Sequence, residues 1–217
     1  MKFDEFEFSE ELKRAIDKLG FKEPTKIQKE AIPLVLKGKD VIGESATGSG
    51  KTLAFGAGVM KKVIPGQGLQ ALILAPTREL AEQVRSMIQD LAPKEMSVIS
   101  IYGGVAIEPQ MKQLHTADVV IATPGRLKDH MQRKTVDLSK ISLLVLDEAD
   151  RMLDMGFIDD IEYIIRACPK KRQTLFFSAT FSSKIEHLAR KYLHDPEKVM
   201  ATKMVDPSKL EQVFYDV

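Results

Sequence analysis

Residues 41–52 read VIGESATGSGKT, a short apolar run followed by a loop rich in glycine and hydroxyl side chains. A helix is expected to begin near Lys51, at the end of this loop. Backbone N–H groups of such a loop can surround phosphate, while the Lys51 ammonium supplies a charge and the Thr52 hydroxyl a Mg²⁺ ligand. The usual pattern has glycine where this chain has Ser45. A simple Gly-Ser turn that caps a helix therefore stays open as the alternative.

The other apolar runs predict a parallel sheet. They cover residues 71–75, 98–102, 119–122, 143–146 and 175–177. None alternates polar with apolar positions, which is typical of strands buried on both faces under helices. The pattern predicts an α/β, doubly wound fold.

Helical patterns lie before and between these runs. Ser9 is expected to cap a first helix, and Pro24-Thr25 to open a second one that kinks or restarts at Pro33. Later helices are expected over residues 80–91 and 184–193. Ser183, with Glu186 three residues on, predicts a capping box for the last of these.

The stretch LLVLDEAD at residues 143–150 places two acids at the end of a buried strand. Ligands of open parallel sheets bind at such strand ends, so Asp147 is expected on the same edge as Lys51 and can hold Mg²⁺. Glu148 faces a different direction and can orient and deprotonate a water. An acidic helix start favoured by the helix dipole is the alternative, and the apolar strand before it argues against that.

The stretch GFKEPTKIQ at residues 20–28 has two readings of similar weight. Thr25 and Gln28 have the spacing of a capping box at the start of a helix. The Gln28 amide also matches the N6 and N7 edge of adenine, and Phe21 could cover the face of the ring.

Bulk composition restricts the function classes. The formal net charge is +1, so any phosphate binding must come from locally placed groups. Cys168, the one cysteine, excludes an internal disulfide and is expected in the core. No apolar run approaches the roughly 20 residues of a membrane span, and the start is too acidic for a signal peptide. These features lead us to expect a soluble, cytoplasmic and monomeric protein.

Together these stretches resemble the DEAD-box family of RNA helicases. The motifs occur in the family's order, including PTREL at 76–80, Gly103-Gly104, TPGR at 123–126, DEAD at 147–150 and SAT at 178–180. Phe3 stands where the family has an isolated upstream aromatic residue. The family commonly has alanine at the position of Ser45, so serine is a small change that should preserve nucleotide binding.

The resemblance implies a RecA-like fold, a mostly parallel sheet with helices on both faces, and a set of functional residues. It implies ATP and Mg²⁺ as cofactors and RNA as a partner, bound through its backbone with little sequence specificity. The implied ATP-binding residues are Phe21, Thr25, Gln28, Ser45, Ala46, Thr47, Gly48, Ser49, Gly50, Lys51 and Thr52. Thr52 and Asp147 would hold Mg²⁺, Asp147 through water, and the catalytic residues would be Glu148, Asp147 and Lys51. The implied RNA-binding residues are Pro76, Thr77, Arg78, Glu79, Gly103, Gly104, Thr123, Pro124, Gly125 and Arg126. Asp150, Ser178 and Thr180 would couple the two sites.

The chain departs from the family in its extent. Residues 1–204 are expected to form one RecA-like ATP-binding domain, with the N-terminal helices and the adenine-reading motif in residues 1–38. Residues 205–217 are expected to be a linker and the start of a second RecA-like domain, which in the family supplies an arginine finger worth roughly 10³–10⁵ in rate. We therefore expect an N-terminal domain of a longer protein. A natural single-domain ATP or RNA clamp, and an unrelated phosphate-loop ATPase or kinase, remain the alternatives.

Overall fold

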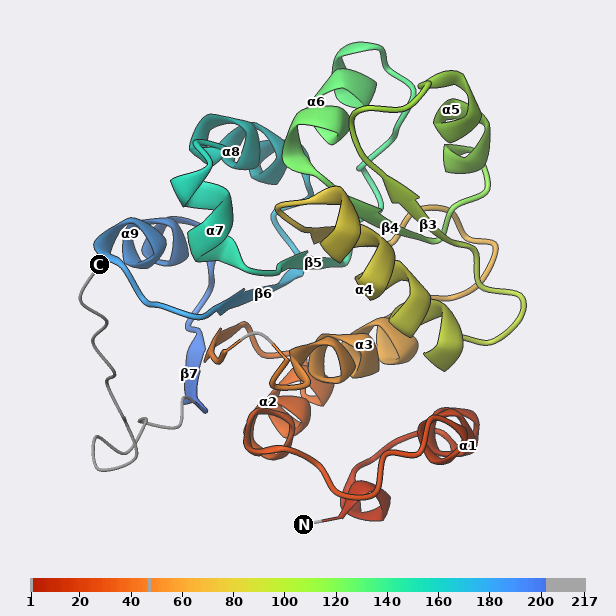
Figure 1. The fold of residues 1–217 in the computed structure, drawn as a ribbon, viewed down its shortest axis with the longest axis vertical. Coiled ribbons are helices and arrows are strands. Elements are labelled where there is room, and N and C mark those ends of the chain that lie inside the picture. The colour runs from red at the N-terminus through yellow and green to blue at the C-terminus, as the bar shows by residue number, and fades with distance from the viewer. Residues whose placement is uncertain (1, 47, 202–217) are drawn as a thin grey trace, which may run out of the picture.

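The computed structural model describes residues 2–46 and 48–201. Within this part seven strands form one sheet in the order β3-β4-β2-β5-β6-β1-β7, and every pairing between them is parallel (Figure 1). The strands are β1 Val41–Glu44, β2 Ala71–Leu74, β3 Val98–Ile101, β4 Val119–Ala122, β5 Leu143–Leu146, β6 Gln173–Ser178 and β7 Glu197–Met200. The predicted α/β, doubly wound fold is confirmed. The linker and strand expected over residues 205–217 lie outside the described residues.

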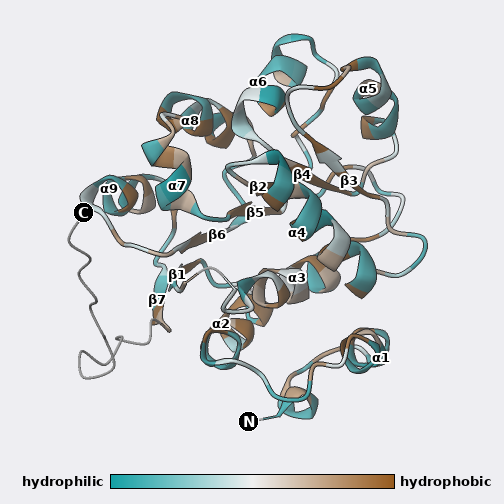
Figure 2. Cartoon of the chain, in the orientation of Figure 1, coloured by the Kyte–Doolittle hydropathy of each residue, from teal (hydrophilic) through white to brown (hydrophobic). Residues whose placement is uncertain are grey.

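Two hydrophobic cores lie on opposite faces of the sheet, because successive strand residues point to opposite faces. In β5, for example, Leu143 and Val145 belong to one core, and Leu144 and Leu146 to the other. Hydropathy follows this division. The strands in the middle are apolar, and the helices outside carry both apolar and polar residues (Figure 2). Cys168 lies in the second core, where burial raises the pKa of its thiol to about 11.

Helices cover both faces. Helices α1 to α4 lie on one side of the sheet and α6 to α9 on the other, while α5 lies beside β3 (Figure 1). Their bounds are α1 Glu10–Lys18, α2 Lys26–Leu36, α3 Lys51–Lys62, α4 Arg78–Leu91, α5 Glu108–Leu114, α6 Pro124–Gln132, α7 Ala149–Asp154, α8 Ile158–Ala167 and α9 Ser183–Tyr192, with a 3-10 helix at Phe3–Glu5. The expected cap of α1 is present, since Ser9 Oγ accepts the Leu12 N–H at 3.2 Å.

One expectation about the helices is wrong. Ser182 caps α9, because its hydroxyl accepts the Ile185 N–H, and Ser183 is the first helical residue. Helix α2 was expected to kink or restart at Pro33, and it is continuous through this residue, so it does not restart there. A proline inside a helix removes one backbone bond, and close packing compensates for it here. A Cβ at Gly58 of α3 would lie 2.7 Å from Val35 Cγ1, so the glycine lets the two helices approach closely.

The sheet order determines where a functional site can form. Strands β1 and β5 flank β6, so their carboxyl ends lie side by side on one edge. Ser45 directly follows β1, Asp147 directly follows β5, and Ser178 is the last residue of β6. Three stretches that are far apart in the sequence therefore meet at the edge where open parallel sheets bind ligands.

Candidate nucleotide site

A hollow of about 380 Å³ lies at this carboxyl edge. The residues that line it come from the loop before α3, the end of β5, the α2 region and one face of α4. They are Phe21, Gln28, Gly48, Gly50, Lys51, Thr52, Leu53, Leu80, Gln83, Val84, Met87, Asp147 and Glu148. Residues predicted from three separate motifs thus border one hollow. Gln83, Leu80 and Met87 are not among the predicted site residues, although all three lie in the helix expected over residues 80–91.

The loop before α3 depends on glycine at two positions. Gly48 has φ +78° and Gly50 has φ +89°, a left-handed region that residues with a Cβ seldom adopt. A Cβ at Gly50 would also collide with the side-chain amide of Gln28. The loop is anchored at its start, where the Ser45 N–H donates to the Ser178 carbonyl at 2.9 Å. The Ser45 hydroxyl is fully buried and has no hydrogen-bond partner among the described residues.

Lys51, Asp147 and Glu148 form a buried charge cluster. Lys51 Nζ lies 3.1 Å from Asp147 Oδ1 and 3.7 Å from Glu148 Oε1. All three side chains are nearly inaccessible, and two carboxylates share one ammonium. Burial raises the pKa of the Asp147 carboxyl above its ordinary value, although the Lys51 charge opposes the shift. Arg151 supplies a second cation, 3.3 Å from Glu148 Oε2, so the raised pKa of Asp147 reflects burial and not a shortage of positive charge.

Glu148 is held in an unusual backbone conformation. Its φ of +51° and ψ of +52° are left-handed, which costs on the order of 1–3 kcal/mol for a residue other than glycine. The position ends the turn from β5 and precedes α7, and it directs the side chain into the hollow. Glu148 Oε2 also accepts a bond from Arg151 Nη1 at 3.3 Å. Such strain is common at functional sites, where the surrounding structure enforces it.

Thr25 and Gln28 form hydrogen bonds to the loop before α3. The expected capping box is present, and in it the Thr25 N–H donates to Gln28 Oε1 at 2.9 Å. The same side chains also bond the loop: Thr25 Oγ1 donates to the Ser49 carbonyl at 2.8 Å, and Gln28 Nε2 donates to the Gly50 carbonyl at 2.9 Å. A side-chain amide has two donors and two acceptor positions. After these bonds Gln28 keeps one of each, which is what the adenine edge requires.

Asp150 joins the ends of β5 and β6. Its Oδ2 accepts the Thr180 N–H at 2.9 Å and the Thr180 hydroxyl at 3.0 Å. Ser178 Oγ donates to the Thr180 carbonyl at 2.7 Å and accepts the Asp150 N–H at 3.3 Å. Partial burial works against ionisation, but the bonds from Thr180 and Ser178 hold the pKa of Asp150 below its ordinary value. These residues, interpreted above as a coupling group, are in direct contact with one another and, through Ser178, with the loop.

The residues expected to contact RNA lie at the carboxyl ends of β2, β3 and β4. Thr77 and Thr123 are the N-caps of α4 and α6, and Gly103-Gly104 follows β3. Arg78 stacks over Tyr102, with its guanidinium carbon 4.9 Å from the ring centroid. Helix N-termini and exposed glycine backbone suit phosphate contacts.

Arg126 has a structural role in addition to its charge. Its guanidinium donates to Gln110 Oε1 at 3.2 Å and to the Val105 carbonyl at 2.8 Å, so it holds the loop after Gly104. His130 continues this network, with Nε2 3.2 Å from Gln110 Oε1. Burial lowers the pKa of His130, and the Arg126 charge lowers it further. No motif or spacing along the chain pointed to Gln110.

The donor set fits Mg²⁺. Thr52 and Asp147 both line the hollow, and neither Asp147 oxygen accepts a hydrogen bond of normal geometry within the described residues. A hydroxyl and a carboxylate are oxygen ligands of the kind that Mg²⁺ takes, with water completing its octahedron. No group of three or more His, Cys, Asp or Glu side chains suited to a metal occurs in the described part of the chain.

A parallel sheet with a glycine-rich loop, a lysine and a carboxylate pair at its strand ends defines a phosphate-loop nucleotide-binding protein. The model of the DEAD/DEAH box helicase family matches residues 25–188, and the chain belongs to this family. None of the helices among residues 2–46 and 48–201 has the length and apolar character to cross a membrane.

Two curated relatives are RNA helicases of bacteria. The ATP-dependent RNA helicase CshA of Listeria monocytogenes is 44% identical over 220 residues, which cover 100% of this chain and 42% of that protein. The DEAD-box ATP-dependent RNA helicase CshA of Geobacillus kaustophilus is 46% identical, covering 99% of this chain and 47% of that protein. The chain thus spans slightly less than half the length of these relatives.

The fold is shared with solved structures. The crystal structure of a DEAD box protein from Methanococcus jannaschii matches with a TM-score of 0.90 at 43% identity, covering 93% of this chain and 56% of that one. A hypothetical ATP-dependent RNA helicase from Sulfolobus tokodaii matches with a TM-score of 0.83 at 38% identity, covering 89% of this chain and 57% of that one.

Proposed function

We propose that this chain is the N-terminal ATP- and RNA-binding domain of an ATP-dependent RNA helicase that uses Mg²⁺. The observation that carries the proposal is the convergence of Gln28, Lys51 and Asp147 on one hollow, at a strand edge shared with the expected RNA-binding residues. We infer that a second RecA-like domain completes the site, since no arginine of the described part lines this hollow. Such an arginine finger is worth roughly 10³–10⁵ in rate.

In this proposal the site residues have separate roles in nucleotide binding and hydrolysis. Gln28 and Phe21 hold the base, and the loop at 45–52 holds the phosphates through its N–H groups and the Lys51 ammonium. Glu148 takes the proton of the attacking water. Thr52 and Asp147 would hold Mg²⁺, which would supply positive charge to balance the charge that develops on the phosphate oxygens. Because Lys51 is now paired with Asp147 and Glu148, its shift from carboxylate to phosphate belongs to the binding step.

The Asp150, Ser178 and Thr180 group relays nucleotide binding to RNA in this proposal. It contacts the start of the loop through Ser178 and the end of β5 through Asp150. RNA contacts by Thr77, Thr123 and the glycine pair go to the backbone, so they position the strand without reading its sequence. The proposed outcome is local separation of short duplexes when the two domains close.

Gln28→Ala is expected to reduce the preference for ATP over GTP by about 1–3 kcal/mol, because the adenine edge loses its polar partner. The measurement is the ratio of the two dissociation constants by calorimetry. Since Gln28 also bonds Gly50, loop damage must be separated from base reading. Affinity for tripolyphosphate, which has no base, reports on the loop alone. An unchanged ATP to GTP ratio would favour a phosphate-loop enzyme that does not read adenine.

A further inference from the structure

A larger hollow, of about 670 Å³, lies at the opposite edge of the sheet, where β1, β5 and β6 begin. Its lining residues come from the ends of α2 and α3 and from the segments that lead into β5, β6 and β7. They are Gly38, Lys62, Ser142, Lys170, Lys171, Arg172, Gln173 and His194. None of these residues has an apolar side chain, and four of them are lysine or arginine. Nothing in the proposed ATP or RNA site uses this edge.

The cations of this hollow have no ion-pair partners within residues 2–46 and 48–201. No carboxylate of this part of the chain lies within salt-bridge distance of Lys62, Lys170 or Lys171, and Arg172 donates to the Pro169 carbonyl at 2.7 Å. Lys62 is half-buried, and burial lowers the pKa of its ammonium although Asp40 opposes the shift.

The acid beside the hollow is already engaged. Asp40 is buried, and its two oxygens accept the backbone N–H groups of Thr174 and His194, both at 2.7 Å. Because the Asp40 carboxylate accepts hydrogen bonds from the backbone, the lysines at the mouth of the hollow have no close counter-charge from the described residues.

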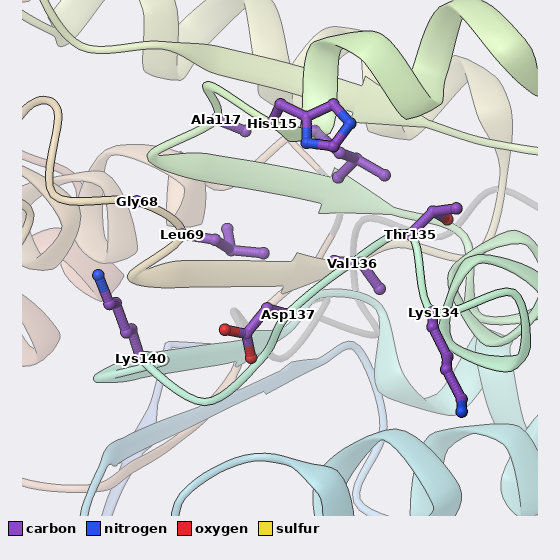
Figure 3. A pocket seen from close by; sticks show the side chains of 10 residues that line it. Gly68, Leu69, His115, Ala117, Lys134, Thr135, Val136, Asp137 and Lys140 are labelled. Atoms are coloured by element: carbon purple, nitrogen blue, oxygen red, sulfur yellow. The ribbon is translucent and has the colours of Figure 1, made fainter.

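The same edge carries one more lysine in the neighbouring hollow, drawn in Figure 3. Lys140 lies near Gly68 where β5 begins (Figure 3). Its Nζ donates to the Gln67 carbonyl at 3.1 Å. It is two residues from Ser142 of the larger hollow. Asp137, which shares the neighbouring hollow, accepts bonds from the N–H and hydroxyl of Ser139. We call Lys62, Lys140, Lys170, Lys171, Arg172 and His194 the amino-edge basic surface.

We propose that the amino-edge basic surface binds the phosphate backbone of RNA, independently of ATP. The chain has a formal net charge of only +1, so this local surplus of unpaired cations is a feature of the edge and not of the whole molecule. Unpaired lysines around a hollow are suited to release the counterions of a polyanion. The surface would hold RNA that flanks the strand bound at the carboxyl edge.

The shape and chemistry of the surface favour RNA over an acidic peptide. Protein partners dock through apolar and aromatic anchors, and the residues lining the larger hollow offer none. The starts of β5, β6 and β1 span about 10 Å at the usual strand spacing of about 4.8 Å. That length is enough to face more than one phosphate of a bound strand. Because none of the lining residues is aromatic and able to stack on bases, binding is expected to be indifferent to sequence.

The surface is separate from the nucleotide site. The six residues of β6 run from Gln173 at the basic edge to Ser178 at the ATP edge. At about 3.3 Å per residue this separates the two edges by roughly 17 Å. Substitutions at Lys170 and Lys171, which are both exposed, are therefore expected to leave ATP binding unchanged.

The test compares two double variants with the same charge change. Lys170→Glu with Lys171→Glu alters the surface, while Lys94→Glu with Lys112→Glu alters exposed lysines beside β3, at the far end of the sheet. Affinity for a fluorescent single-stranded RNA is measured by anisotropy without nucleotide, at several salt concentrations. Each lost phosphate contact lowers the affinity for RNA about fivefold at about 0.1 M salt. The first variant, which loses two contacts, should therefore bind RNA about 25-fold more weakly. Its salt slope should fall by about 1.4, and the control should change by less than about threefold with an unchanged slope. Melting temperatures and ATP affinity verify that both variants are folded.

Equal weakening in both variants would assign the effect to net charge and overturn the proposal. Intact RNA binding in the Lys170/Lys171 variant would also overturn it, while the proposed function would stand as long as the parent chain binds RNA. Polyglutamate is the competitor that separates the partner classes. If it displaced RNA from the parent chain as well as unlabelled RNA does, the surface would belong to an acidic polypeptide and the RNA assignment would fail.

Discussion

Glu148→Gln is expected to lower RNA-stimulated ATP turnover in the full-length protein by about 10²–10⁴-fold, the usual worth of a general base. Glutamine keeps the size of the side chain and an acceptor for Arg151, but it cannot take a proton from water. Glu148 points into the hollow beside Lys51 and Asp147, so the substitution removes the carboxylate proposed to accept the proton of the attacking water. Mg·ATP affinity should change little, because no binding contact is assigned to this carboxylate.

The measurement is steady-state phosphate release with saturating RNA, together with a direct binding titration of Mg·ATP. Glu186→Gln is the matched control, since Glu186 lies on α9 in exposed ion pairs and should leave turnover unchanged. A turnover loss of less than about tenfold for Glu148→Gln would remove Glu148 from the role of base. A parallel loss of Mg·ATP binding would reassign Glu148 to nucleotide or metal binding.

Asp147→Asn is expected to weaken Mg·ATP binding and to stabilise the nucleotide-free chain. Loss of a carboxylate that holds a metal through water costs about 10–100-fold in metal affinity. Without nucleotide, the same change removes a negative charge that burial disfavours, while Lys51 keeps Glu148 as its partner. We expect a gain of about 1 kcal/mol, or about 2–4 °C in melting temperature for a domain of this size.

The raised pKa of Asp147 sets how the stability gain of Asp147→Asn depends on pH. The folded-state pKa of Asp147 is raised, so the native chain binds this proton more tightly than the unfolded chain does. The free energy of unfolding therefore falls as pH rises from the unfolded pKa through the folded pKa of Asp147. An asparagine side chain resembles the protonated form of Asp147. The gain in stability of the Asp147→Asn variant should therefore be full at high pH and should vanish as pH falls through that window.

Asp150→Asn is the matched control with the opposite sign. Bonds from Thr180 and Ser178 hold the pKa of Asp150 below its ordinary value, so its ionised form is the one that stabilises the fold. The same substitution three residues away should therefore lower the melting temperature at neutral pH. If Asp147→Asn and Asp150→Asn both destabilised the nucleotide-free chain, the burial cost inferred for the ionised Asp147 carboxylate would be wrong. These measurements use thermal melts of both variants across pH.

The fold was predictable where both faces of a strand are buried. Four runs, among them Val119–Ala122 and Leu143–Leu146, carry no polar residue, and the structure has a strand at each. Strand β7 was missed because only Val199 among its four residues is buried, so it has no apolar run. The cap of α9 was misplaced by one residue because two serines stand together, and backbone dihedrals alone decide between them.

The sequence predicted which motifs meet at the candidate site, but not the individual contacts between their side chains. Residue types and strand ends brought Lys51, Asp147 and Glu148 to one edge. That Gln28 bonds the Gly50 carbonyl depends on how α2 packs against the loop, which spacing along the chain does not encode. The same holds for the Arg126, Gln110 and His130 network, whose members contact one another only through the packing of α5 and α6.

The central claim is that one Mg·ATP is held jointly by the loop at 45–52, by Asp147 and by Gln28. A crystal structure of this chain with Mg²⁺ and a non-hydrolysable ATP analogue tests it most directly. We predict phosphates against the loop with Lys51 turned from the carboxylates toward them, the metal near Thr52 and Asp147, and adenine against Phe21 and Gln28. Nucleotide bound in another hollow, or bound here with its base away from Gln28, would contradict this claim.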